Sequence, residues 1–130
     1  MNSSLDKGIL SFTDLRVWKE GHSFILGIYK TVNQFPKNET WGLSDQIRRA
    51  SVSITCNISE GYGMRTYKDK IRFYYMSQGS INEVKNLLLI SKDLKYIDKE
   101  TFDTLALKIN VIHKMLINLI RTTRSYKKNL

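Results

Sequence analysis

The chain has 130 residues, of which 42% are hydrophobic and 25% are charged, a composition typical of one soluble globular domain. It contains no apolar run of transmembrane length, and the first dozen residues have no apolar run of signal-peptide length. A single cysteine, Cys56, excludes an internal disulfide. We therefore expect a cytoplasmic protein with one hydrophobic core.

The formal net charge of +9 is unevenly distributed. All 12 acidic residues occur by Asp103, and every charged residue from Thr104 onward is basic. This asymmetry favours a polyanionic partner, either nucleic acid or an acidic protein surface. Solubility alone is an equally good explanation of the charge.

The first expected elements are a flexible N-terminus over residues 1–12 and a helix over 13–33 with Thr13 as N-cap. Positions spaced by three and four predict the core face of this helix: Leu15, Trp18, His22, Ile25, Tyr29 and Val32. His22 is therefore expected to be a buried or half-buried, hydrogen-bonded histidine. The only proline, Pro36, marks the turn that follows.

A second helix is predicted over 39–61. Its core face consists of Leu43, Ile47, Ala50, Ile54, Asn57 and Gly61, and a polar stripe beside it consists of Gln46, Arg49, Ser53, Cys56 and Glu60. The residues between the two stripes are mostly small, which allows another backbone to come close. Gly61 is expected to end the helix as a left-handed C-cap.

The remaining elements are helices over 66–95 and 98–126 and a basic tail over 127–130. Thr66 with Asp69 reads as a capping box, and Asp98 reads as an N-cap. The last helix has an unbroken core series, Phe102, Leu105, Ile109, Ile112, Leu116 and Leu119. Four amphipathic helices with short connections predict an all-α, antiparallel up-down-up-down four-helix bundle. Extra apolar residues on the last two helices favour an oligomer, although a wide core stripe also explains them.

Catalytic and metal-binding patterns are missing. His22 and His113 are the only histidines, and neither has a second ligand at metal-binding spacing. The pair Gly61 and Gly63 lacks the context of a phosphate-binding loop. We expect no enzyme activity, no metal and no cofactor. Arg49, Glu60 and Glu83 are expected to form ion pairs with another helix or another subunit.

Basic and aromatic residues alternate around the connection between the second and third helices. Basic side chains bind phosphates and aromatic rings stack on unpaired bases, so this segment is a candidate RNA-binding site. The basic residues are Arg65, Lys68, Lys70 and Arg72, and the aromatic ones are Tyr62, Tyr67 and Tyr74. A solvated end of the bundle is the equally weighted alternative.

Several blocks of the sequence, in order, resemble a known bacterial family. They are Phe12-Thr-Asp-Leu15, Val17-Trp18, Phe35-Pro36, Leu43-Ser-Asp-Gln46-Ile-Arg-Arg49-Ala50, Ser53-Ile54, Asn57-Ile-Ser-Glu60-Gly61, Gly79-Ser80 and Glu83. Over residues 12–122 the chain is similar to the four-helix-bundle proteins encoded within intervening sequences of 23S rRNA genes. Two departures are Ser59, where alanine is usual, and Met64, which precedes the arginine that often follows the glycine pair.

The resemblance implies a ring-shaped homo-oligomer, with a pentamer expected, and no enzyme activity. It also implies that the structural signature of the bundle is Gln46, Arg49, Asn57, Glu60, Gly61, Gly79 and Glu83. A distant relative is the accessory variability determinant of diversity-generating retroelements, a basic pentamer that binds nucleic acid and its reverse transcriptase.

Two functional hypotheses follow. The first is a non-enzymatic oligomer that binds nucleic acid, with structured RNA favoured. Its candidate contacts are Arg65, Lys68, Lys70, Arg72, Arg121, Arg124, Lys127 and Lys128. The second is a protein-interaction adaptor, for example an accessory partner of a reverse transcriptase.

Overall fold

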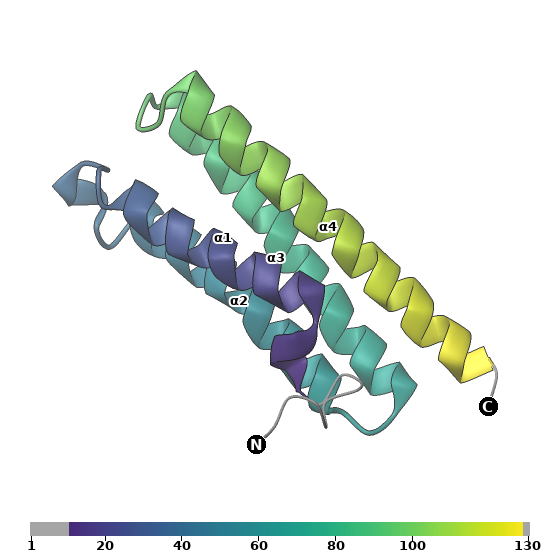
Figure 1. Ribbon diagram of the computed structural model, residues 1–130. Coiled ribbons are helices and arrows are strands. Elements are labelled where there is room, and N and C mark those ends of the chain that lie inside the picture. Colours follow the sequence, from purple (N-terminus) through teal and green to yellow (C-terminus); the bar gives the residue numbers. More distant parts are fainter. Residues whose placement is uncertain (1–10, 129–130) are drawn as a thin grey trace, which may run out of the picture.

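The computed structural model describes residues 11–128, which form four long helices, each antiparallel to the next (Figure 1). They are α1 (Arg16–Val32), α2 (Leu43–Gly63), α3 (Tyr67–Asp93) and α4 (Lys99–Lys128), with short 3-10 helices η2 (Phe12–Asp14) and η3 (Lys37–Glu39). No strand occurs within residues 11–128. The predicted all-α four-helix bundle is therefore confirmed.

Two of the predicted helix caps are observed. Thr66 Oγ1 accepts a hydrogen bond from the backbone N–H of Asp69 at 3.1 Å, and Asp98 Oδ1 accepts one from Thr101 N–H at 2.8 Å. The backbone hydrogen bond from Thr101 lowers the pKa of the Asp98 carboxyl, because it stabilises the ionised form. Local side-chain chemistry thus determines where α3 and α4 begin.

The first helix begins later than predicted. Ser11, rather than Thr13, is the N-cap of η2, and its hydroxyl accepts from Thr13 N–H at 3.2 Å. Leu15 then adopts an extended conformation with its side chain buried, and α1 begins at Arg16. Ser11 and Thr13 are both residue types that cap helices, and the chain uses Ser11.

The second helix also begins later, at Leu43, because η3 occupies residues 37–39. Glu39 supplies the missing cap, since its Oε1 accepts from Leu43 N–H at 3.1 Å. Its Oε2 accepts from the Tyr96 hydroxyl at 2.8 Å, which joins the α1–α2 connection to the α3–α4 connection. The bond from Leu43, followed by that from Tyr96, lowers the pKa of Glu39.

Most of the predicted core face is buried in α2 and α4, although in α2 Asn57 is only half-buried and the fully buried Ile58 was not predicted. The prediction is only half right for the first helix, where Leu15, Ile25 and Val32 are buried and the other three residues are not. His22 and Tyr29 are exposed, and the buried residues of α1 are Val17, Gly21, Phe24, Ile25, Ile28 and Val32. The His22 ring stacks on the Trp18 ring with centroids 4.7 Å apart, so the prediction of a buried histidine is wrong. Two three-four series overlap in this helix, and the more apolar one is buried because its burial removes more hydrocarbon from water.

Gly61 is not a left-handed cap, because α2 continues through it to Gly63 and no glycine in residues 11–128 has a positive φ. Its role is steric. A Cβ atom at this position would lie 2.6 Å from Cε1 of Tyr74, whose side chain is only 2% exposed. Gly61 thus lets the Tyr74 ring of α3 pack directly on the backbone of α2. Burial raises the pKa of Tyr74 to about 12, with a smaller contribution from Tyr62.

Candidate nucleic-acid interface

The antiparallel topology brings two basic segments that are far apart in the sequence to the same end of the bundle. The α2–α3 connection and the C-terminus of α4 both lie at the lower right in Figure 1. We call this region the basic end and define it by five exposed residues, Arg65, Lys68, Arg72, Arg121 and Arg124. All five were predicted as contacts from the sequence, and the fold places the two groups at the same end.

Arg65, Lys68 and Arg72 form the contribution from the α2–α3 side. Arg65 and Lys68 are exposed and belong to no ion pair within residues 11–128. The Arg72 guanidinium lies 4.6 Å from the centre of the Phe73 ring and 3.9 Å from the Asp69 carboxylate. The weak, exposed contact with Asp69 leaves Arg72 available to a phosphate.

Lys70, the fourth predicted contact in this segment, has a different environment. Its ammonium donates to the backbone carbonyl of Tyr62 at 2.6 Å and lies 5.3 Å from the centre of the Tyr62 ring. Partial burial lowers its pKa. Lys70 therefore satisfies a carbonyl at the C-terminus of α2, where a positive charge is favourable.

Arg121 and Arg124 form the contribution from α4. The Arg124 guanidinium lies 5.3 Å from the centre of the Tyr75 ring and hydrogen-bonds to the Tyr75 hydroxyl, which ties α4 to α3 at this end. The other two predicted contacts, Lys127 and Lys128, complete α4, and their side chains lie outside the described part of the structure.

One aromatic residue that is exposed near the basic end is not among the three predicted from the sequence. Tyr74, a predicted stacking residue, is buried, and Tyr62 and Tyr67 are half-buried. The neighbouring Tyr75 is 42% exposed and was missed by the sequence analysis. Its position three residues after Arg72, on the outward side of the same helix, was the available signal.

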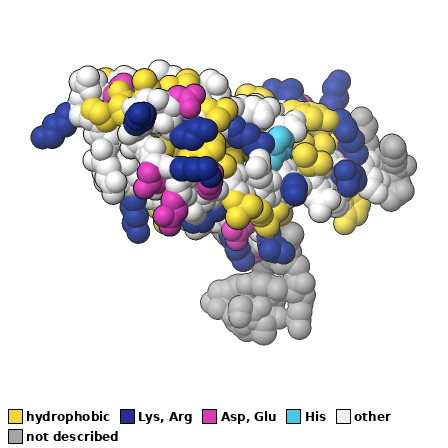
Figure 2. Space-filling view, turned by 90° about the horizontal axis from the view of Figure 1, so that it is seen from above, with side chains coloured by type: hydrophobic (Ala, Val, Ile, Leu, Met, Phe, Trp, Pro, Cys, Tyr) yellow, Lys and Arg dark blue, Asp and Glu magenta, His cyan; other side chains and the backbone are white. Residues whose placement is uncertain are grey.

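The surface charge agrees with this arrangement. In Figure 2, basic side chains surround an apolar area on the half of the visible face that carries the histidine, whereas most of the acidic side chains gather on the other half. Between Thr104 and the end of α4 the sequence contains no acid. A polyanion that approaches this half of the face therefore meets little negative charge that would repel it.

A second surface lies on the outer side of α2 and α3, where most of the signature residues are located. The hydroxyls of Ser53 and Ser80 are 2.8 Å apart across the two helices and mark the seam of this surface. The Asn57 amide strengthens the seam by donating to the Ser53 carbonyl at 2.9 Å and to its hydroxyl at 3.0 Å. Exposed side chains and an open glycine flank the seam: Gln46, Arg49, Cys56, Glu60, Met76, Gly79 and Glu83. We call it the α2–α3 outer face.

The ion pairs predicted between helices of the bundle do not form. Arg49 pairs with Asp45 at 2.8 Å on its own helix, and all four ion pairs within residues 11–128 join positions three or four apart on one helix. Glu60 and Glu83 belong to none of these pairs. The prediction is therefore wrong for contacts within one chain, and a contact with another subunit stays a prediction.

A polar cluster centred on His113 joins α3 to α4 beside the basic end. Lys85 Nζ lies 2.8 Å from His113 Nδ1, and Gln78 Nε2 lies 3.1 Å from His113 Nε2. Burial, followed by the charge of Lys85, lowers the pKa of His113. The imidazole is consequently neutral near pH 7.

The described residues contain neither a cluster of metal-ligating side chains nor a membrane-spanning helix. No group of three or more His, Cys, Asp or Glu in this part of the chain could hold a metal ion. The single cysteine, Cys56, is exposed, as its place in the polar stripe of the second helix predicts. Within residues 11–128, no helix is long and apolar enough to cross a membrane.

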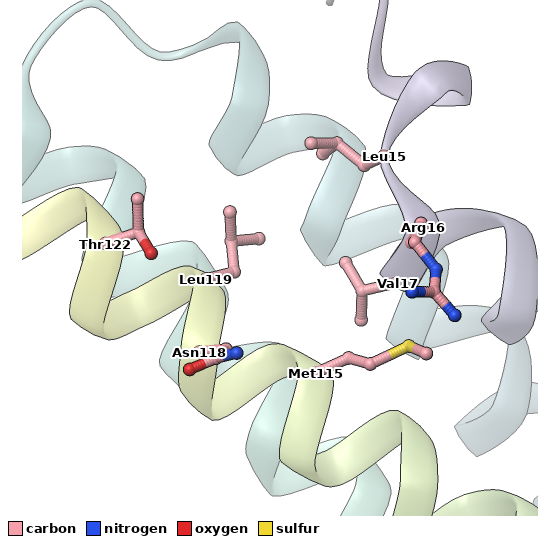
Figure 3. Close-up of a pocket in the computed structure, with 7 residues that line it drawn as sticks. All are labelled: Leu15, Arg16, Val17, Met115, Asn118, Leu119 and Thr122. Carbon is pink, nitrogen blue, oxygen red and sulfur yellow. The ribbon is translucent and has the colours of Figure 1, made fainter.

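A cleft of about 240 Å³ lies between the beginning of α1 and the last turns of α4 (Figure 3). Met115 and Leu119 of α4 project from one side, opposite Leu15 and Val17 on the other. Arg16 is the one charged residue among those that line it. The residues that line the cleft include no acid, histidine or cysteine, so none of them could activate the Thr122 hydroxyl as a general base.

Comparisons with known proteins identify a family and solved structures of similar fold. Residues 13–118 match the family described as "23S rRNA-intervening sequence protein". A crystal structure from Bacteroides thetaiotaomicron, described as a protein with unknown function from the S23 ribosomal protein family, is similar with a TM-score of 0.72 and 27% identity. The match covers 80% of this chain and 97% of that one. The search of curated proteins gives no match.

Proposed function

Because the chain belongs to the 23S rRNA-intervening sequence protein family, we propose that it is a non-enzymatic protein that binds structured RNA through its basic end. The observation that carries this proposal is the convergence of two basic segments, one from the α2–α3 connection and one from α4, at one end of the bundle. A phosphate backbone attracts such a surface and gives affinity that depends little on base sequence.

The geometry favours phosphate contacts over the alternative role in solubility. Four exposed side chains, Lys68, Arg72, Arg121 and Arg124, come from two helices, and Arg124 contacts α3 through Tyr75. A charge that served only solubility needs no such grouping. An RNA hairpin spans both helices and places its phosphates against both groups.

The experiment compares two fourfold variants in their binding to an RNA hairpin across a salt series. One variant combines Lys68→Gln, Arg72→Gln, Arg121→Gln and Arg124→Gln. The matched control removes four lysines nearer the opposite end, with Lys30→Gln, Lys37→Gln, Lys95→Gln and Lys99→Gln. Both variants lose the same net charge, the first from the basic end and the control from nearer the opposite end.

We expect the first variant to bind more weakly and to show a flatter salt dependence, with the logarithmic slope reduced by about 0.7–0.9 for each phosphate that the variant no longer neutralises. The control should retain most of the wild-type slope. Equal reductions in the two variants would show that net charge alone drives binding and would refute the site.

We further propose that the chain forms a homo-oligomer through the α2–α3 outer face, with the family resemblance favouring a five-membered ring. This face carries both signs of charge, Arg49 against Glu60 and Glu83, and the two glutamates form no ion pair within residues 11–128. A second copy could therefore pair with them. Gly79 supports this proposal, since a Cβ there would meet no atom of the chain within 4 Å.

The mass of the protein in solution, measured with wild type and with Glu60→Gln/Glu83→Gln, tests the oligomer. We expect a defined oligomer for wild type. The variant should dissociate at a lower salt concentration than wild type does, because it lacks two of the charges proposed to pair between subunits. A wild-type monomer at micromolar concentration would overturn the proposal. If the folded protein binds no RNA at low salt, the adaptor hypothesis becomes the better explanation of the exposed face and the basic end.

A further inference from the structure

Helices α3 and α4 form an open pocket of about 320 Å³ within the basic end. It is lined by Tyr75, Gln78, Ile117, Ile120, Arg121 and Arg124. This volume lies at the lower end of the range of small-ligand sites, about 300–1,000 Å³. The pocket therefore suits a ligand group of the size of one nucleotide rather than a helix or a duplex.

The walls of the pocket combine three kinds of surface. Ile117 and Ile120 supply hydrocarbon, and the Tyr75 ring, with the Arg124 guanidinium at its hydroxyl end 5.3 Å from the ring centre, supplies an aromatic plane and a guanidinium plane. Aromatic rings and guanidinium planes are the groups on which unpaired bases stack. Arg121, exposed on α4, supplies a positive charge for the phosphate of the same nucleotide.

Gln78 adds an amide group whose orientation follows from its hydrogen bond with His113. Because Lys85 can only donate, His113 Nδ1 accepts its hydrogen bond, and the neutral ring carries its proton on Nε2. That N–H needs an acceptor, so the Gln78 amide, whose nitrogen lies 3.1 Å from His113 Nε2, is assigned with its two end atoms exchanged and Oε1 facing the ring. The NH₂ group of Gln78 is then free to donate to an acceptor on the edge of a base.

We propose that this pocket binds an unpaired nucleotide of RNA, with the base stacked on the Tyr75–Arg124 pair and the phosphate on Arg121. The proposal rests on the proposed function and makes it more specific, since the basic end then reads a bulged or looped-out base as well as phosphates. A carboxylate of an acidic protein would use the two arginines but neither the stacking surface nor the apolar wall.

The test uses two RNAs with the same stem, one fully paired and one carrying a single bulged adenosine. We expect wild type to prefer the bulged RNA by roughly tenfold or more, the size of effect that a stacked base gives. Tyr75→Leu should remove this preference and leave the affinity for the paired RNA nearly unchanged. Tyr75→Phe keeps the ring and should keep the preference.

Tyr29→Leu is the matched control. Tyr29 is 44% exposed and has the Arg48 guanidinium 6.0 Å from its ring centre, but it lies on α1 and lines no part of this pocket. A fluorescent base analogue at the bulge should report stacking with wild type and Tyr29→Leu and give no such signal with Tyr75→Leu.

The possible outcomes separate this inference from the proposed function. Equal, salt-dependent affinity of wild type for both RNAs would overturn the nucleotide pocket and leave electrostatic binding intact. Equal effects of Tyr75→Leu and Tyr29→Leu would overturn the pocket as well. Binding of neither RNA at low salt would overturn the proposed function itself.

Discussion

The contact between Gly61 and Tyr74 predicts the consequence of adding a single methyl group to α2. In Gly61→Ala the new Cβ would lie 2.6 Å and 2.8 Å from two carbons of the Tyr74 ring and 3.1 Å from the Lys70 carbonyl oxygen. The ring is buried and cannot move aside without disturbing the core. Overpacking of this kind costs about 1–3 kcal/mol in unfolding free energy.

Alanine also has a higher helix propensity than glycine, which recovers up to about 1 kcal/mol. Because the clash involves a buried ring and a backbone atom, we expect the upper part of the overpacking range and a net loss of about 1–2 kcal/mol. For a chain of this length, each kcal/mol shifts the melting temperature by about 4 °C. Urea and thermal unfolding followed by circular dichroism measure both quantities.

Gly27→Ala is the matched control, since Gly27 is also helical but a Cβ there meets nothing within 4 Å. That variant should gain about 0.5–1 kcal/mol in unfolding free energy. In addition, Gly61→Ala combined with Tyr74→Leu should show a favourable coupling, because the smaller side chain makes room for the methyl group. If Gly61→Ala were as stabilising as Gly27→Ala, the close packing inferred for α2 and α3 would be refuted.

Three further predictions concern Lys70, Gly79 and His113. Lys70→Gln should lower the unfolding free energy by about 0.5–1.5 kcal/mol, because it removes the bond to the Tyr62 carbonyl, and should weaken RNA binding less than Lys68→Gln does; the reverse order of RNA affinities would contradict the structural role. Gly79→Ala should stabilise the dissociated chain by about 0.5–1 kcal/mol yet weaken its assembly, and an unchanged mass in solution would count against the α2–α3 outer face. The lowered pKa of His113 means that the unfolded chain binds more protons below about pH 6.5, so the unfolding free energy should fall as the pH decreases from 7.5 to 5.5. His113→Gln should show a smaller decrease in urea unfolding over that range, and an identical decrease would exclude this contribution.

Periodicity predicted most of the α2 and α4 core faces because each helix has a strong apolar series, but in α2 it included the half-buried Asn57 and missed the buried Ile58. It was only half right for the first helix, where two series overlap and the less polar one is buried. It also misread Gly61, since a glycine near a helix end resembles a C-cap unless the position of Tyr74 on another helix is known. Such long-range contacts leave no local signal.

The basic residues of the candidate site were predicted from the sequence, but their grouping at one end and the exposure of the side chains around them were not. The sequence identifies the basic residues, whereas the antiparallel topology places the two groups at one end. Within residues 73–76, which are Phe, Tyr, Tyr and Met, packing against both α2 and α4 decides that Tyr74 is buried and Tyr75 is exposed. The same packing directs Lys70 to a carbonyl of α2 and leaves its neighbour Lys68 in solvent.

The most direct test of RNA binding by the basic end is the affinity of the wild-type protein for a structured RNA hairpin, measured from low to physiological salt, with the mass of the complex determined in parallel. We predict tight binding at low salt that weakens linearly on logarithmic axes, with a slope corresponding to several phosphate contacts at about 0.7–0.9 each. A folded protein that does not bind the hairpin at low salt, or binds it without salt dependence, would contradict RNA binding by this end of the bundle.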